Sequence, residues 1–241
     1  MKLQLLASTL FALAALPLSA ASTLINIDFK TGSGSMSGAA VLGAAGDVWN
    51  APNTNPSSSA AVFSLVDSSN AAAGSLTYYS GTAGNGSGFN AGTGANPAAL
   101  MDGIAGSANG GSGTSYAQIT FEFTGLLANT TYDIVAYGAS TAGTDRGTLF
   151  FNTVGGSVLG STTGGSVDIA GGAGTAYTTF QLTTDGSGAF NILTNYNSAS
   201  SAQGPVNGFQ LQAVAVPEPS WSVLASFGLV SLALRRRRHA H

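Results

Sequence analysis

The segment Gln118–Thr124, QITFEFT, decides the fold class of this chain. Its apolar residues stand at every second position, with polar residues between them. Because successive side chains of a β-strand point to opposite faces, this pattern predicts a strand with one dry face and one wet face. The segment Gly208–Ala213, GFQLQA, repeats the pattern near the end of the domain. We expect these polar residues to face water: Gln118, Thr120, Glu122, Thr124, Gln210 and Gln212.

Short runs of the same kind fill the middle of the chain. They are rich in β-branched and aromatic residues and are separated by Gly, Asn, Ser and Asp, while helical periodicity is nearly absent. Turn signals at short intervals favour an antiparallel β-sandwich or jelly roll. The predicted strands are Thr23–Phe29, Ala61–Val66, Leu76–Tyr79, Tyr116–Phe123, Tyr132–Tyr137, Thr148–Val154, Ala176–Leu182, Ala189–Leu193 and Val206–Val214.

The composition excludes several classes of protein. Charged residues make up 7% of the 241 residues, Gly numbers 34 and Cys is absent, against roughly 25% charged residues in ordinary soluble proteins. A disulfide-linked module, a zinc site with thiolate ligands and a coiled coil are therefore excluded. Residues 32–60 and 80–114 are rich in Gly, Ser and Ala and are expected to be long surface loops. The Gly-rich stretch Gly155–Gly174 leaves a β-solenoid open as a minor alternative.

The first 21 residues have the pattern of a secretory signal peptide. Lys2 is followed by an apolar run, then Pro17 and small residues. Ser19 and Ala21 stand three residues and one residue before a cut that would make Ser22 the first residue of the mature chain. The alternative is a buried N-terminal helix, but a helix apolar on all sides has no polar face to present to water.

The other end of the chain carries a second membrane signal. Residues 221–234 form an uncharged stretch, followed directly by Arg235, Arg236, Arg237 and Arg238. As a helix this stretch rises about 21 Å, which is short of the roughly 30 Å hydrocarbon core, so it is a marginal transmembrane helix. The arginines predict that its C-terminal side stays in the cytoplasm, which places the intervening domain across the membrane.

Between the domain and that helix stand Pro217, Glu218, Pro219 and Ser220. A Pro-Glu-Pro motif, a short apolar helix and an arginine cluster, in this order, resemble the C-terminal sorting signal of PEP-CTERM proteins. The resemblance implies that residues 216–241 are recognised and processed by a membrane-embedded exosortase in a Gram-negative bacterium. Two prolines hold the segment extended and accessible. The alternative is a plain linker to a permanent membrane anchor.

Removing both ends leaves an acidic exported domain, residues 22–215. Residues 22–216 contain two basic residues, Lys30 and Arg146, against nine acidic ones, which leaves a net charge of −7. The basic residues of the full chain lie mostly in its terminal signals, so no basic face is left for phosphate and we expect no nucleic-acid partner.

The exported domain also resembles, more weakly, malectin-like and galactose-binding-like β-sandwiches. The segments that carry this resemblance are Ile25–Phe29, Gly125–Tyr137 and Val206–Leu211. It implies that the first and last strands lie in the sandwich and that loops at one edge hold sugar. Trp49, Tyr78 and Tyr79 are the candidate stacking platforms for a sugar ring, with core packing as the alternative.

The exported domain offers little for catalysis. Both histidines, His239 and His241, lie in the tail, so Ser-His-Asp, Cys-His and His-metal sites are excluded from the domain. Its carboxylates occur singly, mostly beside turn residues. No cofactor is expected, and calcium held near Asp28 or Asp168 is the one alternative.

We therefore expect a non-enzymatic cell-surface or extracellular-matrix protein. Its partners would be the secretion machinery, signal peptidase and exosortase, and it would pass from an inner-membrane precursor to the surface. The alternatives are a carbohydrate-binding module for exopolysaccharide and a glycosidase that uses two carboxylates.

Overall fold

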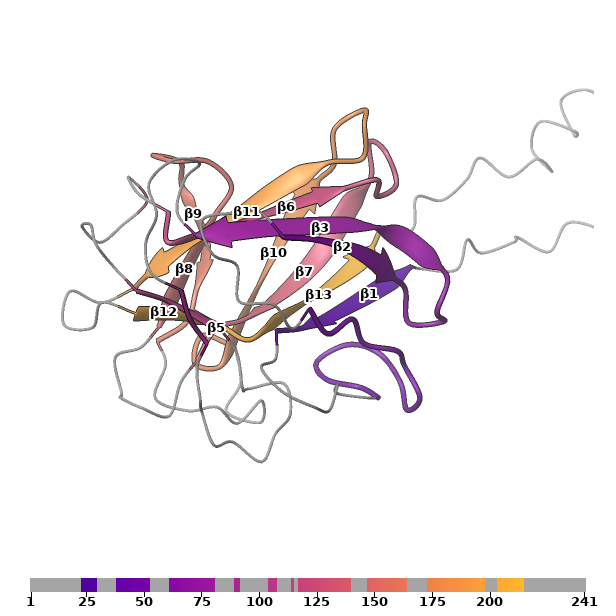
Figure 1. The fold of residues 1–241 in the computed structure, drawn as a ribbon, viewed down its shortest axis with the longest axis horizontal. Helices are drawn as coiled ribbons and strands as arrows, with labels where there is room; N and C mark the ends of the chain where they lie inside the picture. Colours follow the sequence, from indigo (N-terminus) through magenta and orange to yellow (C-terminus); the bar gives the residue numbers. More distant parts are fainter. Residues whose placement is uncertain are drawn as a thin grey trace, which may run out of the picture. The chain divides into compact units, whose positions relative to one another are not determined.

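The computed structural model describes residues 23–29, 38–52, 61–80, 89–91, 104–107, 114, 117–139, 147–163, 173–197 and 203–214. These residues form antiparallel sheets with no helix among them (Figure 1). The predicted all-β class is therefore confirmed. Residues Ser22–Val214 make up one compact unit.

The first sheet has four strands. Its spatial order is β1 (Leu24–Asp28), β13 (Gly208–Ala213), β7 (Thr131–Tyr137) and β10 (Tyr177–Thr183). The first and last of the described strands pair directly, with Leu24 opposite Gln212 and Asp28 opposite Gly208.

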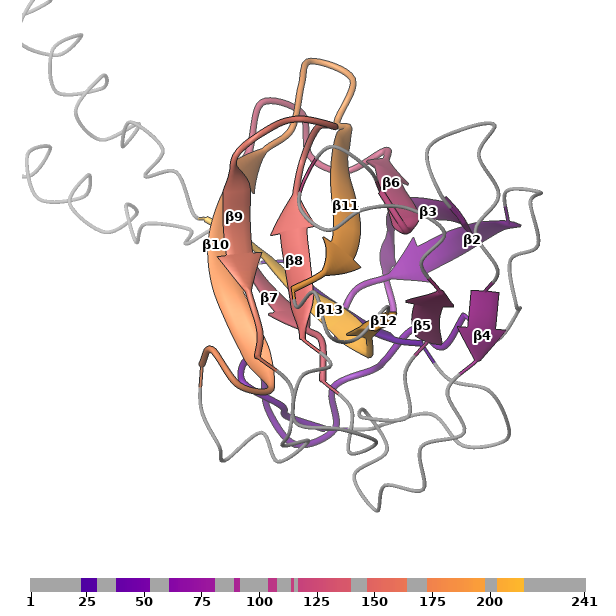
Figure 2. The same cartoon turned by 90° about the vertical axis from the view of Figure 1, so that its left-hand side faces the viewer.

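The second sheet has six strands and a third, small sheet has three. The order in the second sheet is β2 (Ala61–Val66), β3 (Ala72–Ser80), β6 (Ile119–Thr124), β11 (Phe190–Tyr196), β8 (Thr148–Phe151) and β9 (Val158–Ser161). The small sheet runs in the order β12 (Gln203–Val206), β5 (Ile104–Ser107) and β4 (Phe89–Ala91). Figure 2 shows β9 beside β10, where the two larger sheets approach each other.

The hydrophobic core is shared by the two larger sheets. Phe209 of the first sheet lies 5.1 Å from Phe121 of the second, measured between ring centroids, and Phe29 lies 5.1 Å from Phe121. Because alternate residues turn to one face, the apolar residues of both quoted segments enter this core, as predicted. Phe121 and Phe123 are fully buried.

The two ends of the sheets differ. One end holds Leu24 and Ala213, together with the starts of β7 and β11, and we call it the terminal end. Its strand connections are short: residues 67–71, 125–130, 152–157 and 184–189. The opposite end, the loop end, carries the longer connections, which join β1 to β2, β3 to β6 through β4 and β5, β7 to β8 and β9 to β10.

Several strand predictions need correction. β3 starts four residues earlier than predicted, because Gly74, with φ 112°, lies where the register of the β2–β3 pair shifts and interrupts the alternation. β4 and β5 lie within a predicted loop, and β9 lies within the Gly-rich stretch. The last predicted strand divides at Asn207, where the chain passes from the small sheet to the first one.

The prediction of wet faces is wrong at three positions. Gln210, Gln118 and Thr120 are buried, although each occupies the polar position of an alternating strand. For Gln210 the cause is the segment Gly38–Pro52, which lies within a predicted surface loop but packs on the outer face of the first sheet. An alternating pattern shows which residues share a face of the sheet, but it does not show which segment packs on that face.

The terminal signals lie outside the described residues. The roles assigned to residues 1–21, which include Ser19 and Ala21, to Ser22 and to residues 216–241 therefore stay predictions. Among the described residues, no helix is long and apolar enough to cross a membrane.

Candidate functional site

Trp49, predicted as a stacking platform for sugar, is a core residue instead. Its side chain is 6% exposed and clusters with Val135, Tyr137 and Ala176. The indole Nε1–H donates a hydrogen bond to the carbonyl of Gly38 at 2.7 Å. The ring therefore packs against buried side chains and its N–H is hydrogen-bonded. Both contacts lie inside the protein, where they anchor the segment that carries Trp49 to the sheet.

A buried polar cluster fixes the same segment. The Gln210 Oε1 atom accepts hydrogen bonds from the Tyr137 hydroxyl at 2.7 Å and from the Leu42 N–H at 2.9 Å. Its Nε2 donates to Asn26 Oδ1 at 2.8 Å and to the Leu42 carbonyl at 3.0 Å. Burial raises the pKa of Tyr137 above its ordinary value. Every polar atom of the Gln210 side chain is satisfied, so the cluster is structural.

The other two predicted aromatic residues have different environments. Tyr78 is fully buried between Phe29 and Phe63, each 5.3 Å away by ring centroids, so it is also a core residue and offers no face to a ligand. Tyr79 is half-buried on the opposite face of the same strand, and its hydroxyl donates to Glu122 Oε1 at 2.8 Å. Burial, followed by the neighbouring Glu122, raises the pKa of Tyr79 to about 12.

Two acidic residues close matching turns at the terminal end. Asp67 Oδ1 accepts from the Ser69 N–H at 2.9 Å, the Ser69 hydroxyl at 2.7 Å and the Ala71 N–H at 2.9 Å. Asp185 Oδ1 accepts from the Ser187 N–H at 2.8 Å, the Ser187 hydroxyl at 2.7 Å and the Ala189 N–H at 3.0 Å.

These two turns share a sequence pattern that our sequence reasoning missed. Asp-x-Ser is followed by a residue with positive φ and then by Ala: Asn70 has φ 70° and Gly188 has φ 77°. The serine hydroxyl is the main cause that lowers the pKa of each aspartate, and backbone N–H groups add to it.

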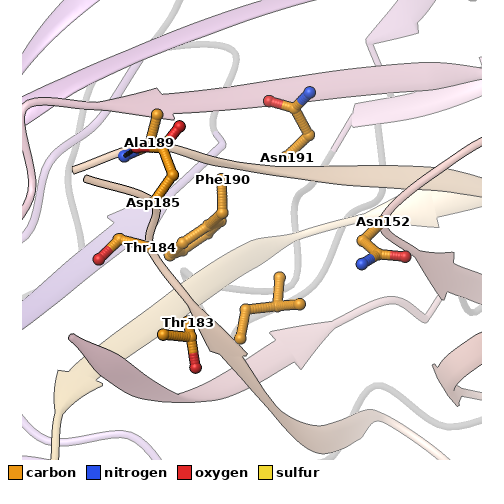
Figure 3. A pocket seen from close by; sticks show the side chains of 8 residues that line it. Asn152, Thr183, Thr184, Asp185, Ala189, Phe190 and Asn191 are labelled. Atoms are coloured by element: carbon orange, nitrogen blue, oxygen red, sulfur yellow. Dashed lines mark hydrogen bonds between the residues drawn. The ribbon is translucent and has the colours of Figure 1, made fainter. Parts of the chain in front are cut away.

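The described residues line one notable notch, of about 370 Å³, at the terminal end (Figure 3). Its apolar floor is made of Leu182 and Phe190, each 9% exposed. The notch exists because β8 ends at Phe151, which leaves the first residues of β11 without a neighbour on that side. Its lining residues are Asn152, Leu182, Thr183, Thr184, Asp185, Ala189, Phe190 and Asn191.

Only part of the polar rim is available to a ligand. The Thr184 hydroxyl donates to the Leu127 carbonyl at 2.6 Å, and the Thr183 hydroxyl bonds that of Thr131 at 2.9 Å. By contrast, no described residue bonds the side-chain amides of Asn152 and Asn191, and the hydrogen bonds that Asp185 accepts from Ser187 and Ala189 all go to its Oδ1 atom. Figure 3 shows Phe190 between Asp185 on one side and the two amides on the other.

The remaining carboxylates of the described region have structural partners. Asp47 Oδ2 accepts from the Ala44 N–H at 2.9 Å, and Asp133 Oδ1 accepts from the Gln181 amide at 2.7 Å. Asp28 is buried in β1, whereas Asp168 lies outside the described residues. Within the described ranges, no three His, Cys, Asp or Glu side chains come together as a metal-binding group.

The comparisons with known proteins add no relative. No protein-family model matches the chain, and no curated protein matches it. The sorting residues Pro217, Glu218, Pro219 and Ser220, and the cluster Arg235, Arg236, Arg237 and Arg238, lie outside the described residues.

Proposed function

We propose that this chain is an exported, non-enzymatic surface or matrix protein that is sorted through a PEP-CTERM signal. The observation that carries the proposal is the sequence order of Pro217–Pro219, an apolar helix and four arginines, with a signal peptide at the opposite end. Signal peptidase and exosortase act on the two ends, and the β-sandwich between them is the exported cargo.

The position of the domain's own ends supports this proposal. The Ala213 N–H donates to the Thr23 carbonyl at 3.0 Å, so the first described residue of the domain and the end of its last strand are neighbours. Pro217 follows only four residues after Ala213, the end of the last strand. A processing enzyme that cuts near this motif therefore needs no strand to open.

The finer fold that we propose is a jelly roll. β6 pairs with β11 in one sheet while β7, which follows β6, pairs with β10 in the other. β6 and β7 thus form a unit that crosses from one sheet to the other, and β10 and β11 form a second such unit. The pairing of two crossing units, one strand pair in each sheet, is typical of jelly rolls.

The experiment that tests sorting compares two variants with the parent chain in a host that carries an exosortase. One variant deletes Arg235–Arg238 and the other replaces Pro217, Glu218 and Pro219 with Ala. We expect both to leave unprocessed precursor in the inner membrane, whereas the parent protein is exported without residues 1–21 by intact mass.

A matched control replaces Pro205, which lies inside the domain in β12, with Ala. It should be processed like the parent. Normal processing of both tail variants would show that the tail is not a sorting signal, and an exported protein that retains Met1 would overturn the predicted cleavage.

A second candidate function is glycan binding, and the notch favours it. Its volume lies at the lower end of the roughly 300 to 1,000 Å³ typical of small-ligand sites. Phe190 itself belongs to the core, so the polar rim carries this candidate: the Asn152 and Asn191 amides suit the hydroxyl groups of a sugar, since amides both donate and accept. This site replaces the one predicted around Trp49 and Tyr78, which the core occupies.

A further inference from the structure

The two larger sheets have four edge strands, and three of them are covered. β1 is capped by its own chain: the Asp28 N–H donates to the Asn50 carbonyl at 2.8 Å, and the Asn26 carbonyl accepts from the Asn50 N–H at 2.9 Å. β9 and β10 lie against each other, since a Cβ added at Gly160 would stand 2.6 Å from Thr178 Oγ1. The fourth edge is β2.

Asn50 bonds to the backbone of Val66 at the end of β2, and this contact shows which backbone groups of the strand point away from β3. The Val66 N–H donates to Asn50 Oδ1 at 2.9 Å, and the Val66 carbonyl accepts from Asn50 Nδ2 at 2.7 Å. Both backbone groups of Val66 thus point away from β3. Because these groups alternate along a strand, Ser64 and Val62 turn theirs to the same edge. No described residue outside β3 bonds to the backbone of either one.

Within the described residues, this edge lacks the features that usually prevent strand pairing. Native edge strands are commonly protected by Lys, by Pro or by a covering loop. The sequence of β2, AVFSLV, has neither charge nor proline, and Val62 is 69% exposed. Such a strand offers its backbone to another strand.

We propose that β2 pairs with β2 of a second copy of this chain, antiparallel, about a two-fold axis at Phe63. In this register Val62 lies opposite Ser64 of the second copy, and every free backbone donor and acceptor of these two residues is satisfied. Val66 keeps its bonds to Asn50. The inference goes beyond export and sorting, because it assigns the exported domain an assembly contact.

The side chains favour a second copy as the occupant. Phe63 stacks on Tyr78 at 5.3 Å with an interplanar angle of 20°. At the two-fold axis Phe63 meets its own counterpart on the core-facing side, which extends this aromatic stack from one molecule into the next. An isologous contact of this kind closes as a dimer, and the two six-stranded sheets become one continuous sheet.

The first test measures the association state of the full chain, purified with both terminal segments in a mild detergent, by sedimentation. We expect a dimer in the parent. Ser64→Pro removes half of the donors between the copies, while an outward-facing edge position tolerates proline in the monomer. We expect it to raise the dimer dissociation constant roughly tenfold or more.

Val62→Lys should raise the dimer dissociation constant in the same way. The control is Val158→Lys, at a position 47% exposed on β9, which should leave the dissociation constant unchanged.

The second test fixes the register, because the chain has no cysteine. The double variant Val62→Cys/Ser64→Cys places thiols opposite each other across the proposed pair, and we expect a covalent dimer on mild oxidation. Either single variant puts its thiols on a diagonal, too far apart for a disulfide, and should cross-link far less.

Three results would overturn the proposal. They are a monomeric parent chain, a dimer that Ser64→Pro leaves unchanged, and single cysteine variants that cross-link as well as the double variant. If the parent is monomeric but Ser64→Pro abolishes binding to a different exported protein, the edge serves another strand and the second copy is the wrong occupant.

Discussion

The hydroxyl of Tyr137 and the side-chain oxygen of Gln210 lie 2.7 Å apart in a buried hydrogen bond on the outer face of the first sheet. Without a cover this face would be wet, since both residues are polar and stand opposite the core side of their strands. The segment Gly38–Pro52 supplies the cover, and its Val41 and Leu42 N–H groups bond to the same two side chains. The sheet therefore has a structural layer on each face.

Replacing Gln210 with Leu should destabilise the domain by about 2 to 4 kcal/mol, because the Leu42 backbone, Asn26 and the Tyr137 hydroxyl then lose buried partners. Urea unfolding of residues 22–216, followed by the fluorescence of Trp49, measures this change. The matched control is Gln212→Leu on the same strand, which is half-buried and should cost less than about 1 kcal/mol. Equal effects of both changes would contradict a structural role for the cluster.

Phe121→Ala should lower the free energy of unfolding by roughly 3 to 5 kcal/mol. Its ring contacts Phe29, Tyr78 and Phe209 and is fully buried, so truncation leaves a cavity at the centre of the core. Thermal unfolding monitored by far-UV circular dichroism would detect the loss. Leu127→Ala, at a position 52% exposed, is the control and should barely move the melting temperature. A helical spectrum of the parent domain would contradict the strand assignment itself.

The matching turns predict a dependence of stability on acid. The folded-state pKa of Asp67 and of Asp185 is lowered from the ordinary 3.8, so the unfolded chain binds protons more readily than the folded one. Their contribution is present at neutral pH and is lost as pH falls below about 4, through the folded-state pKa values.

The double variant Asp67→Asn/Asp185→Asn should have a flatter stability profile in this acid range than the parent. Urea midpoints measured at a series of pH values give the two slopes. Ser69→Ala/Ser187→Ala, which removes only the hydroxyl donors, should lie between them. Superimposable profiles of the parent and the Asn variant would count against the turn assignment.

The notch predicts which residues glycan binding would depend on. Asn152→Ala and Asn191→Ala should each weaken binding by about 1 kcal/mol, the usual net contribution of a hydrogen bond, without a matching loss of stability. Calorimetry with purified exopolysaccharide oligomers is the measurement. Thr77→Ala, at a half-buried position of β3 that does not line the notch, is the control. If the parent binds no oligomer, the glycan-binding candidate fails while the sorting proposal is unaffected.

The sequence predicted the strands whose alternation is regular, and it failed where glycine breaks the pattern. β2 has the predicted bounds, and β6 and β7 lie within a few residues of theirs, because period-two runs of large apolar residues are local signals. β9 contains a glycine where β10 comes too close for a side chain, and that requirement is visible only in the folded protein.

For the candidate sites, what the sequence predicts and what the tertiary structure decides are more clearly separated. The sequence alone predicted the all-β class, which the structure confirms, and it alone carries the acidic composition of residues 22–216 and the signals that we propose at the two ends, because each depends on composition or on residues adjacent in the chain. Only the tertiary structure decided that Trp49 is core, that Asn152 and Asp185 line one notch and that β2 is an edge strand with no described partner beyond β3 and Asn50. These facts depend on contacts between residues far apart in sequence, for which a local pattern carries no information.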